Sequence, residues 1–173
     1  GRQAILDLSK VEMYTFWYCY VKPKWGDGVR LVLSDTDSFV MEVKTDDVYA
    51  DISEDVKEHF DTLGYNEPHP SGLSIGVNKQ VPSKVKDELA GDVLEEVVAL
   101  RAKMYGLRTL KGVVDKKAKV PKSVVKRTVH FEHYKKCLLD EQKVMTQFYT
   151  LRSRDHVIHT EKVTKIALSH GDN

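Results

Sequence analysis

Two aspartates separated by one residue, in Asp35-Thr36-Asp37, are the part of this sequence best suited to chemistry. Ser38 follows them, and residues of these types favour turns. Carboxylates held this close repel each other, and a hard divalent cation relieves the repulsion. Magnesium accepts one or two protein carboxylates and keeps room for water and phosphate oxygens, as phosphoryl-transfer sites require. The alternative is an exposed turn in which aspartate serves only its turn preference.

The segments around these aspartates predict how they are positioned. Residues 29–33 and 39–43 are β-forming runs joined by a short polar break, so we expect a β-hairpin with both carboxylates at its tip. Before it, apolar residues recur close to every 3.6 positions between residues 4 and 22. This period predicts a helix with one face packed in a core, ending at Lys22-Pro23.

The rest of the chain predicts an α+β fold. Between residues 46 and 89 we expect one or two short acidic helices in 46–60, a loop in 64–76 and a strand in 84–89. Residues 94–107 are expected to be extended, with a helix in 92–107 as the alternative. We then expect a basic valine-rich segment in 111–129, a helix in 131–149, and one or two strands in 156–168. No internal repeat or low-complexity tract is visible.

Charge is divided unevenly along the chain, although the net charge is only +1. Residues 35–67 hold eleven acidic side chains and two lysines, whereas residues 101–136 hold twelve basic side chains and two acidic ones. An acidic part beside a basic part indicates two tasks, with the basic one facing a polyanion. Two solvated surfaces of opposite sign are the alternative.

Composition excludes several classes of protein. A hydrophobic content of 41% over 173 residues is ordinary for a globular chain. Cys19 and Cys137 form neither a disulfide framework nor a zinc-binding spacing, which suits a reducing, intracellular location. The sequence does not distinguish between the nucleus, the cytoplasm and a viral replication site. The longest apolar stretch, residues 13–21, is too short to span a bilayer, so we expect no membrane partner. Because the chain starts at Gly1, we interpret it as part of a longer polypeptide.

Four segments resemble the family B DNA polymerases, in the branch of viruses and virus-like mobile elements that often use a protein primer. Residues 31–38, Leu-Val-Leu-Ser-Asp-Thr-Asp-Ser, resemble motif C of that family, and residues 5–14 resemble the helix that enters it. Residues 100–105, Leu-Arg-Ala-Lys-Met-Tyr, resemble the K-x-Y motif where palm meets thumb, and residues 84–89 resemble the strand leading toward it. The order of these segments agrees with the family, and the resemblance runs from about Ile5 to about Leu168.

The resemblance implies roles for the residues at the aspartate pair. Asp37 matches the motif C aspartate that binds both catalytic metal ions, and Asp35 matches its partner, which shapes the site and binds metal less directly. Thr36 and Ser38 complete the motif as supporting residues. The implied cofactors are two Mg²⁺ ions, and the implied substrates are deoxynucleoside triphosphates.

The resemblance also implies a DNA-binding surface in the basic part. Lys103 and Tyr105 match the pair that holds the primer strand near its 3′ end, with Arg101 beside them; the alternative is a solvated strand face. Lys111, Lys119 and Lys122 belong to a basic run, residues 111–127, that resembles the part of the thumb following the duplex backbone. Relatives often carry glycine after the lysine that Lys119 matches, where this chain has Val120-Pro121.

The implied architecture has two parts. Residues 1–100 would be the C-terminal part of a palm, with a β-hairpin, a sheet and flanking helices, and residues 101–173 the palm–thumb junction and a mixed α/β thumb-like region. Nothing in the sequence matches motif A, D-x-x-S-L-Y-P, the fingers motif, K-x-x-x-N-S-x-x-G, or an exonuclease motif. The partners implied are therefore primer-template DNA, the upstream remainder of the same polymerase and a terminal priming protein, and this chain alone is not expected to polymerise.

Two other functions remain open. A decayed mobile element would leave a DNA-binding relic without catalysis, and the D-x-D also resembles the metal site of nucleotide-sugar glycosyltransferases. The pairs His130/His133 and His156/His159 have a spacing that metal sites sometimes use, but neither has a third ligand nearby, so we do not expect metal there.

Overall fold

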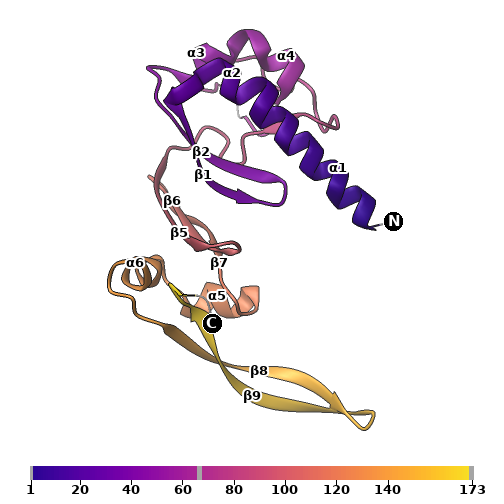
Figure 1. The fold of residues 1–173 in the computed structure, drawn as a ribbon, viewed down its shortest axis with the longest axis vertical. Helices are drawn as coiled ribbons and strands as arrows, with labels where there is room; N and C mark the ends of the chain where they lie inside the picture. Colours follow the sequence, from indigo (N-terminus) through magenta and orange to yellow (C-terminus); the bar gives the residue numbers. More distant parts are fainter. Residues whose placement is uncertain (1, 66–67, 172–173) are drawn as a thin grey trace. The chain divides into compact units, whose positions relative to one another are not determined.

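The chain folds into two compact units, Gly1–Val93 (unit 1) and Leu94–Asn173 (unit 2), in a computed structural model that describes residues 2–65 and 68–171. Each unit contains helices and strands, so the expected α+β fold class is confirmed (Figure 1). The boundary expected between residues 100 and 101 falls inside a strand of unit 2, β5 (Leu94–Arg101). The palm and thumb labels for the two parts stay predictions.

Unit 1 begins with a run of helix made of α1 (Arg2–Thr15), a wide π-type segment (Phe16–Val21) and α2 (Lys22–Trp25). In the wide segment the Lys22 N–H donates to the Trp17 carbonyl. The prediction that the helix ends at Lys22-Pro23 is wrong. Pro23 lies in the first turn of α2, where a residue without an N–H donor is tolerated.

The core of unit 1 forms where this helical run meets the hairpin. Trp17, Val21 and Val29 are buried, and six further apolar residues pack around them: Phe16, Tyr20, Trp25, Phe39, Met41 and Val43. The first half of α1 does not take part, since Ile5 and Leu8 are 68% and 65% exposed. The expectation of one buried face along residues 4–22 is therefore wrong before Phe16, because no described element of unit 1 covers that face.

The predicted hairpin of unit 1 is confirmed. A 3₁₀ turn (Gly26–Gly28) leads into β1 (Val29–Asp35), which pairs antiparallel with β2 (Ser38–Val43). The register shifts between Leu31 and Leu33, a bulge that increases the local twist of the ribbon.

The acidic segment after the hairpin folds as predicted. It forms α3 (Val48–Ile52), a 3₁₀ turn (Ser53–Asp55) and α4 (Val56–His59). Asp47 caps α3, since its carboxylate accepts from the N–H groups of Tyr49 and Ala50. A short parallel pair follows, β3 (Phe60–Asp61) with β4 (Val85–Lys86), so only two residues of the strand expected in 84–89 form. The expected loop 64–76 has no helix or strand in its described residues, and residues 66 and 67 lie outside the description.

Unit 2 is built on an antiparallel sheet in the order β5-β6-β7, with β6 at Met104–Thr109 and β7 at Gly112–Lys117. The extended conformation expected in 94–107 is confirmed, although a turn at Ala102-Lys103 divides it into two strands, and the helix alternative for 92–107 is wrong. Cross-strand pairing and the burial of Val98 and Met104 outweigh the helix propensity of Glu95 and Glu96.

Two helices pack with this sheet, α5 (Lys122–Thr128) and α6 (Phe131–Leu139). The core contains Val98, Met104, Val120, Val124, Val125, Val129, Phe131, Tyr134, Cys137, Ala167 and Leu168. The Tyr134 hydroxyl donates to the Lys117 carbonyl at 2.8 Å, which ties α6 to β7. Gly106 allows a close approach, because a Cβ there would lie 3.1 Å from the Phe131 ring.

A long antiparallel ribbon completes unit 2, with β8 (Val144–Arg154) and β9 (Val157–Leu168) (Figure 1). The strand expected in 156–168 is confirmed, but the helix expected in 131–149 ends at Leu139. Val144 and Phe148 pack against the core on one face, which favours an extended chain over a helix. Residues 151–160 are all exposed.

Candidate metal and nucleic-acid site

The two aspartates of unit 1 lie at a tight turn between paired strands. Asp35 is the last residue of β1 and pairs with Ser38, the first of β2, so only Thr36 and Asp37 form the turn. The Asp37 N–H donates to the Asp35 carbonyl at 2.7 Å, and the Ser38 hydroxyl donates to the same oxygen at 3.1 Å. These bonds fix the backbone from which both carboxylates project.

Thr36 holds this turn in a strained conformation. Its φ of +57° lies in the left-handed region, which a β-branched residue rarely adopts and which costs about 1–2 kcal/mol. Its hydroxyl donates to an Asp35 carboxylate oxygen at 3.3 Å. Eight other non-glycine residues among those described also have positive φ, so this conformation does not by itself mark the turn as functional.

The donor set of the tip fits part of a magnesium site. Asp37 is exposed and Asp35 is half-buried at the same turn. Across residues 2–65 and 68–171, no group of three His, Cys, Asp or Glu side chains is arranged to hold a metal ion. Magnesium needs only one or two protein carboxylates when phosphate oxygens and water complete its shell. Asp35 and Asp37 therefore suit one side of such a site.

Comparison of the chain with family models, curated proteins and solved structures found no match. The resemblance to family B polymerases therefore rests on the motifs of this sequence. In the part of the chain that the structure describes, no helix is both long enough and apolar enough to cross a membrane.

A second hairpin, β5–β6 in unit 2, carries three of the predicted DNA-binding residues. Arg101 ends β5 and pairs with Met104, so Ala102 and Lys103 form a two-residue turn. Lys103 is exposed and has a φ of +57°, so this turn is strained like the aspartate turn. Arg101 is half-buried, and Tyr105 is only 5% exposed. Lys103 is thus exposed at the turn, while Tyr105 packs inside unit 2.

The other predicted DNA-binding lysines also lie in unit 2. Lys111 is exposed at the turn between β6 and β7. Lys119 and Lys122 are exposed just before and at the start of α5, and neither forms an ion pair within the described residues. The structure therefore gathers the predicted metal-binding residues in one unit and the predicted DNA-binding residues in the other.

Part of the basic segment serves the fold. Arg108 bridges Glu95, Glu96 and Glu132 at 3.2, 2.6 and 3.6 Å, joining β5, β6 and α6. Lys135 on α6 also pairs with Glu96, at 2.7 Å. These cations are neutralised by carboxylates, so they add little to a polyanion-binding surface.

The histidine pair 130/133 has a structural role. The His130 N–H donates to His133 Nδ1 at 3.1 Å, and the two residues form a reciprocal cap at the start of α6. Burial, followed by the nearby charge of His130, lowers the pKa of His133. His156 and His159 are exposed at the far end of the β8–β9 ribbon.

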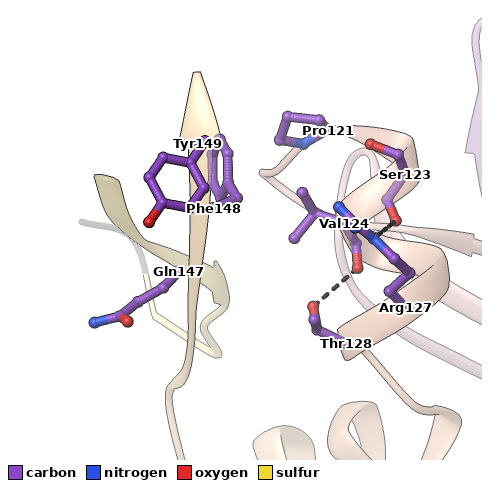
Figure 2. Close-up of a pocket in the computed structure, with 8 residues that line it drawn as sticks. All are labelled: Pro121, Ser123, Val124, Arg127, Thr128, Gln147, Phe148 and Tyr149. Carbon is purple, nitrogen blue, oxygen red and sulfur yellow. Dashed lines mark hydrogen bonds between the residues drawn. The ribbon is translucent and has the colours of Figure 1, made fainter. Parts of the chain in front are cut away.

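Sequence reasoning missed a groove of about 490 Å³ between α5 and β8 (Figure 2). Because a helix was expected over residues 131–149, the strand β8 that lines the groove was not predicted. The alternation of β-branched and aromatic residues at Val144, Thr146, Phe148 and Thr150 is the signal that could have revealed it.

Proposed function

We propose that this chain is part of a family B DNA polymerase and contributes motif C and a primer-template grip to template-directed nucleotidyl transfer. One observation carries the proposal: Asp35-Thr36-Asp37-Ser38 lies at the tip of an antiparallel hairpin, with both aspartates at the turn. A metal site for phosphoryl transfer needs carboxylates in such an accessible, fixed position.

The carboxylates have a direct task in this reaction. Asp37, which is exposed at the turn, would bind metal most directly, and Asp35 would bind it from the end of β1. The bonds from Asp37 N–H and Ser38 to the Asp35 carbonyl keep the two carboxylates in register before substrate arrives. Bound Mg²⁺ ions supply activation of the primer 3′-hydroxyl and neutralisation of the triphosphate.

Unit 2 supports the proposal through charge. Lys103 projects from a fixed turn, and Lys119 and Lys122 form no ion pair within the described residues. Exposed lysines suit contacts to phosphates that do not depend on base sequence, as a moving polymerase requires. Binding of primer-template duplex should therefore weaken steeply with salt, and Lys122→Ala should reduce the salt slope by about one unit.

The apolar stripe on α1 also agrees with a larger parent protein. Ile5, Leu8 and Val11 are 68%, 65% and 57% exposed on one helix. Exposed apolar surface of this kind marks an interaction site, and the upstream remainder of the polymerase is the partner that the motifs imply. A terminal priming protein is a further partner of this branch.

The decisive test is primer extension by the full-length protein with Asp37→Ala. We expect a loss of about a thousandfold or more in kcat, because the substitution removes the main protein ligand of the metal ions. Asp46→Ala is the matched control, since Asp46 is exposed in the same unit and has no role in the proposal. Near-normal incorporation by Asp37→Ala would overturn the assignment.

The same preparation separates the alternatives. Duplex binding with steep salt dependence but no extension by the complete wild-type protein would identify a non-catalytic relic. Tight Mn²⁺ binding with a nucleotide sugar and no affinity for duplex DNA would identify a glycosyltransferase-like site.

A further inference from the structure

The two faces of the hairpin β1–β2 have different surroundings. Every second residue of β2 packs in the core of unit 1: Phe39, Met41 and Val43. Near the tip, Phe39 meets the Trp17 ring edge-on, with 5.9 Å between ring centroids. Successive residues of a strand point to opposite faces, so Ser38 and Val40 lie on the face away from this core, which we call the outer face.

The bulge in β1 decides on which face Asp35 lies. Val29, at the start of the strand, faces the core. Unbroken alternation over the seven residues of β1 would put Asp35 on the same face. The extra residue between Leu31 and Leu33 shifts the register by one, so that Asp35 pairs with Ser38 instead. Asp35 therefore lies on the outer face.

The outer face is apolar next to Asp35. Leu33 pairs with Val40, both are half-buried, and neither belongs to the core of unit 1. Leu33 is two residues before Asp35, about 7 Å along the strand. Farther from the tip, Arg30 and Glu42 form an ion pair at 2.6 Å. The surface beside the Asp35 carboxylate is thus the pair of Leu33 and Val40.

This arrangement limits where a substrate can lie. The core of unit 1 closes one face of the hairpin beside its tip. A nucleotide held through metal ions at Asp35 and Asp37 therefore lies over the outer face or beyond the tip. Leu33 and Val40 have no side-chain donor or acceptor, so they suit the apolar surface of a deoxyribose and base, not a phosphate group.

We propose that Leu33 and Val40 contact the nucleoside part of the substrate whose phosphate or 3′-hydroxyl is held at Asp35 and Asp37. Two reactants carry this group, the primer at its 3′ end and the incoming deoxynucleoside triphosphate. The inference rests on the proposed function and adds two substrate-contact residues to it.

The test compares two leucines of one strand that lie on opposite faces, in the full-length protein. Leu33→Ala shortens the outer face. Leu31→Ala makes the same change at a residue that is 38% exposed and pairs with Met41 on the core face. Anisotropy of a labelled primer-template that ends in a dideoxynucleotide gives its Kd without chemistry, and primer extension gives kcat and the KM of the triphosphate.

We expect Leu33→Ala to raise one of these two constants about five- to tenfold, because apolar surface is no longer buried against the nucleoside. A higher Kd assigns the contact to the primer end, and a higher KM with unchanged Kd assigns it to the triphosphate. Leu31→Ala should change both less than about twofold, since its side chain lies on the other face. Val40→Thr keeps the β-forming shape and should act in the same direction as Leu33→Ala if that variant does not fold by circular dichroism.

Photo-cross-linking locates the contact without catalysis. With p-benzoylphenylalanine in place of Leu33, we expect cross-links to the dideoxy-terminated primer or to the bound triphosphate, and none with the same group in place of Leu31. Equal effects at the two positions, or no effect at Leu33 and Val40, would overturn the inference while Asp37→Ala still abolished extension. Normal extension by Asp37→Ala would instead overturn the proposed function, and this inference with it.

Discussion

The hairpins β1–β2 and β5–β6 both have two-residue turns, and their tips carry opposite charge. Each has a two-residue turn, and in each a residue other than glycine has a φ of +57°: Thr36 in the first and Lys103 in the second. The first turn presents carboxylates, and the second presents an ammonium group. The charged groups of the proposed chemistry thus both lie at two-residue turns that hold a residue in the left-handed region.

The hairpins differ in what lies behind them. In β1–β2, Leu31 and Val32 are 38% and 37% exposed, whereas in β5–β6 Met104 is fully buried and Tyr105 is 5% exposed. The strands next to the basic tip are therefore buried in a packed core, whereas the strands next to the acidic tip are partly exposed to solvent. A hairpin with few buried side chains unfolds locally at a lower free-energy cost than a hairpin packed in a core.

The largest expected effect is on stability, and it distinguishes the packed hairpin β5–β6 from the partly exposed hairpin β1–β2. Met104→Ala should destabilise unit 2 by about 3 kcal/mol, because it leaves a cavity in a packed core. Leu31→Ala should cost less than about 1 kcal/mol, because the side chain is already part-exposed. Urea denaturation measures both: Trp17 and Trp25, the two tryptophans of the chain, report unit 1 by fluorescence, and far-UV circular dichroism reports both units. Equal losses in the two variants would contradict the comparison.

The second prediction concerns the polar contacts that join the N-terminal helical run of unit 1 to the acidic segment after the hairpin. Asp55 accepts from Lys24 Nζ at 2.6 Å and from the Tyr20 hydroxyl at 2.9 Å. The Lys24 hydrogen bond, helped by that of Tyr20, lowers the pKa of Asp55 below its usual value. Because the folded-state pKa is the lower one, Asp55 stabilises unit 1 above its unfolded pKa of about 3.9, and this stability is lost as pH falls through the folded value.

Asp55→Asn tests this contribution. The substitution should cost about 1 kcal/mol at neutral pH and flatten the acid limb of the stability curve of unit 1. Urea titrations followed by tryptophan fluorescence between pH 2 and pH 7, roughly the span over which carboxylates titrate, give the curve. An acid limb as steep as in the wild type would show that other carboxylates govern it. Asp46→Asn is the control, an exposed carboxylate in the same unit.

The smallest expected effect tests the feature that the hairpins share. Thr36→Gly and Lys103→Gly should each stabilise the chain by about 0.5 kcal/mol, since glycine relieves the left-handed strain but loses more entropy on folding. Thermal unfolding measures the gain. Thr109→Gly, at the end of β6, should instead destabilise, because Thr109 is buried and its hydroxyl donates to the Gly112 carbonyl. A loss of stability in both turn variants would show that the turns are not strained.

The sequence by itself determined the elements with strong local signals. The β-forming runs around Asp35 and Asp37 leave one short polar break, so the hairpin and its acidic tip follow from local preference. The acidic helices in 46–60 and the strand in 156–168 follow in the same way. In each case neighbouring residues favour one conformation, and distant contacts are not needed to choose it.

Tertiary structure decided what local patterns leave open. The apolar period of residues 4–22 predicts a helix but not what covers it, and Ile5 and Leu8 remain exposed because no described element of unit 1 packs there. Residues 140–149 leave the helical pattern because Val144 and Phe148 gain more by packing on the core of unit 2 as a strand. The groove between α5 and β8 exists only because that helix packs on that strand. Burial and strand pairing join residues far apart in sequence, so periodicity alone does not reveal them.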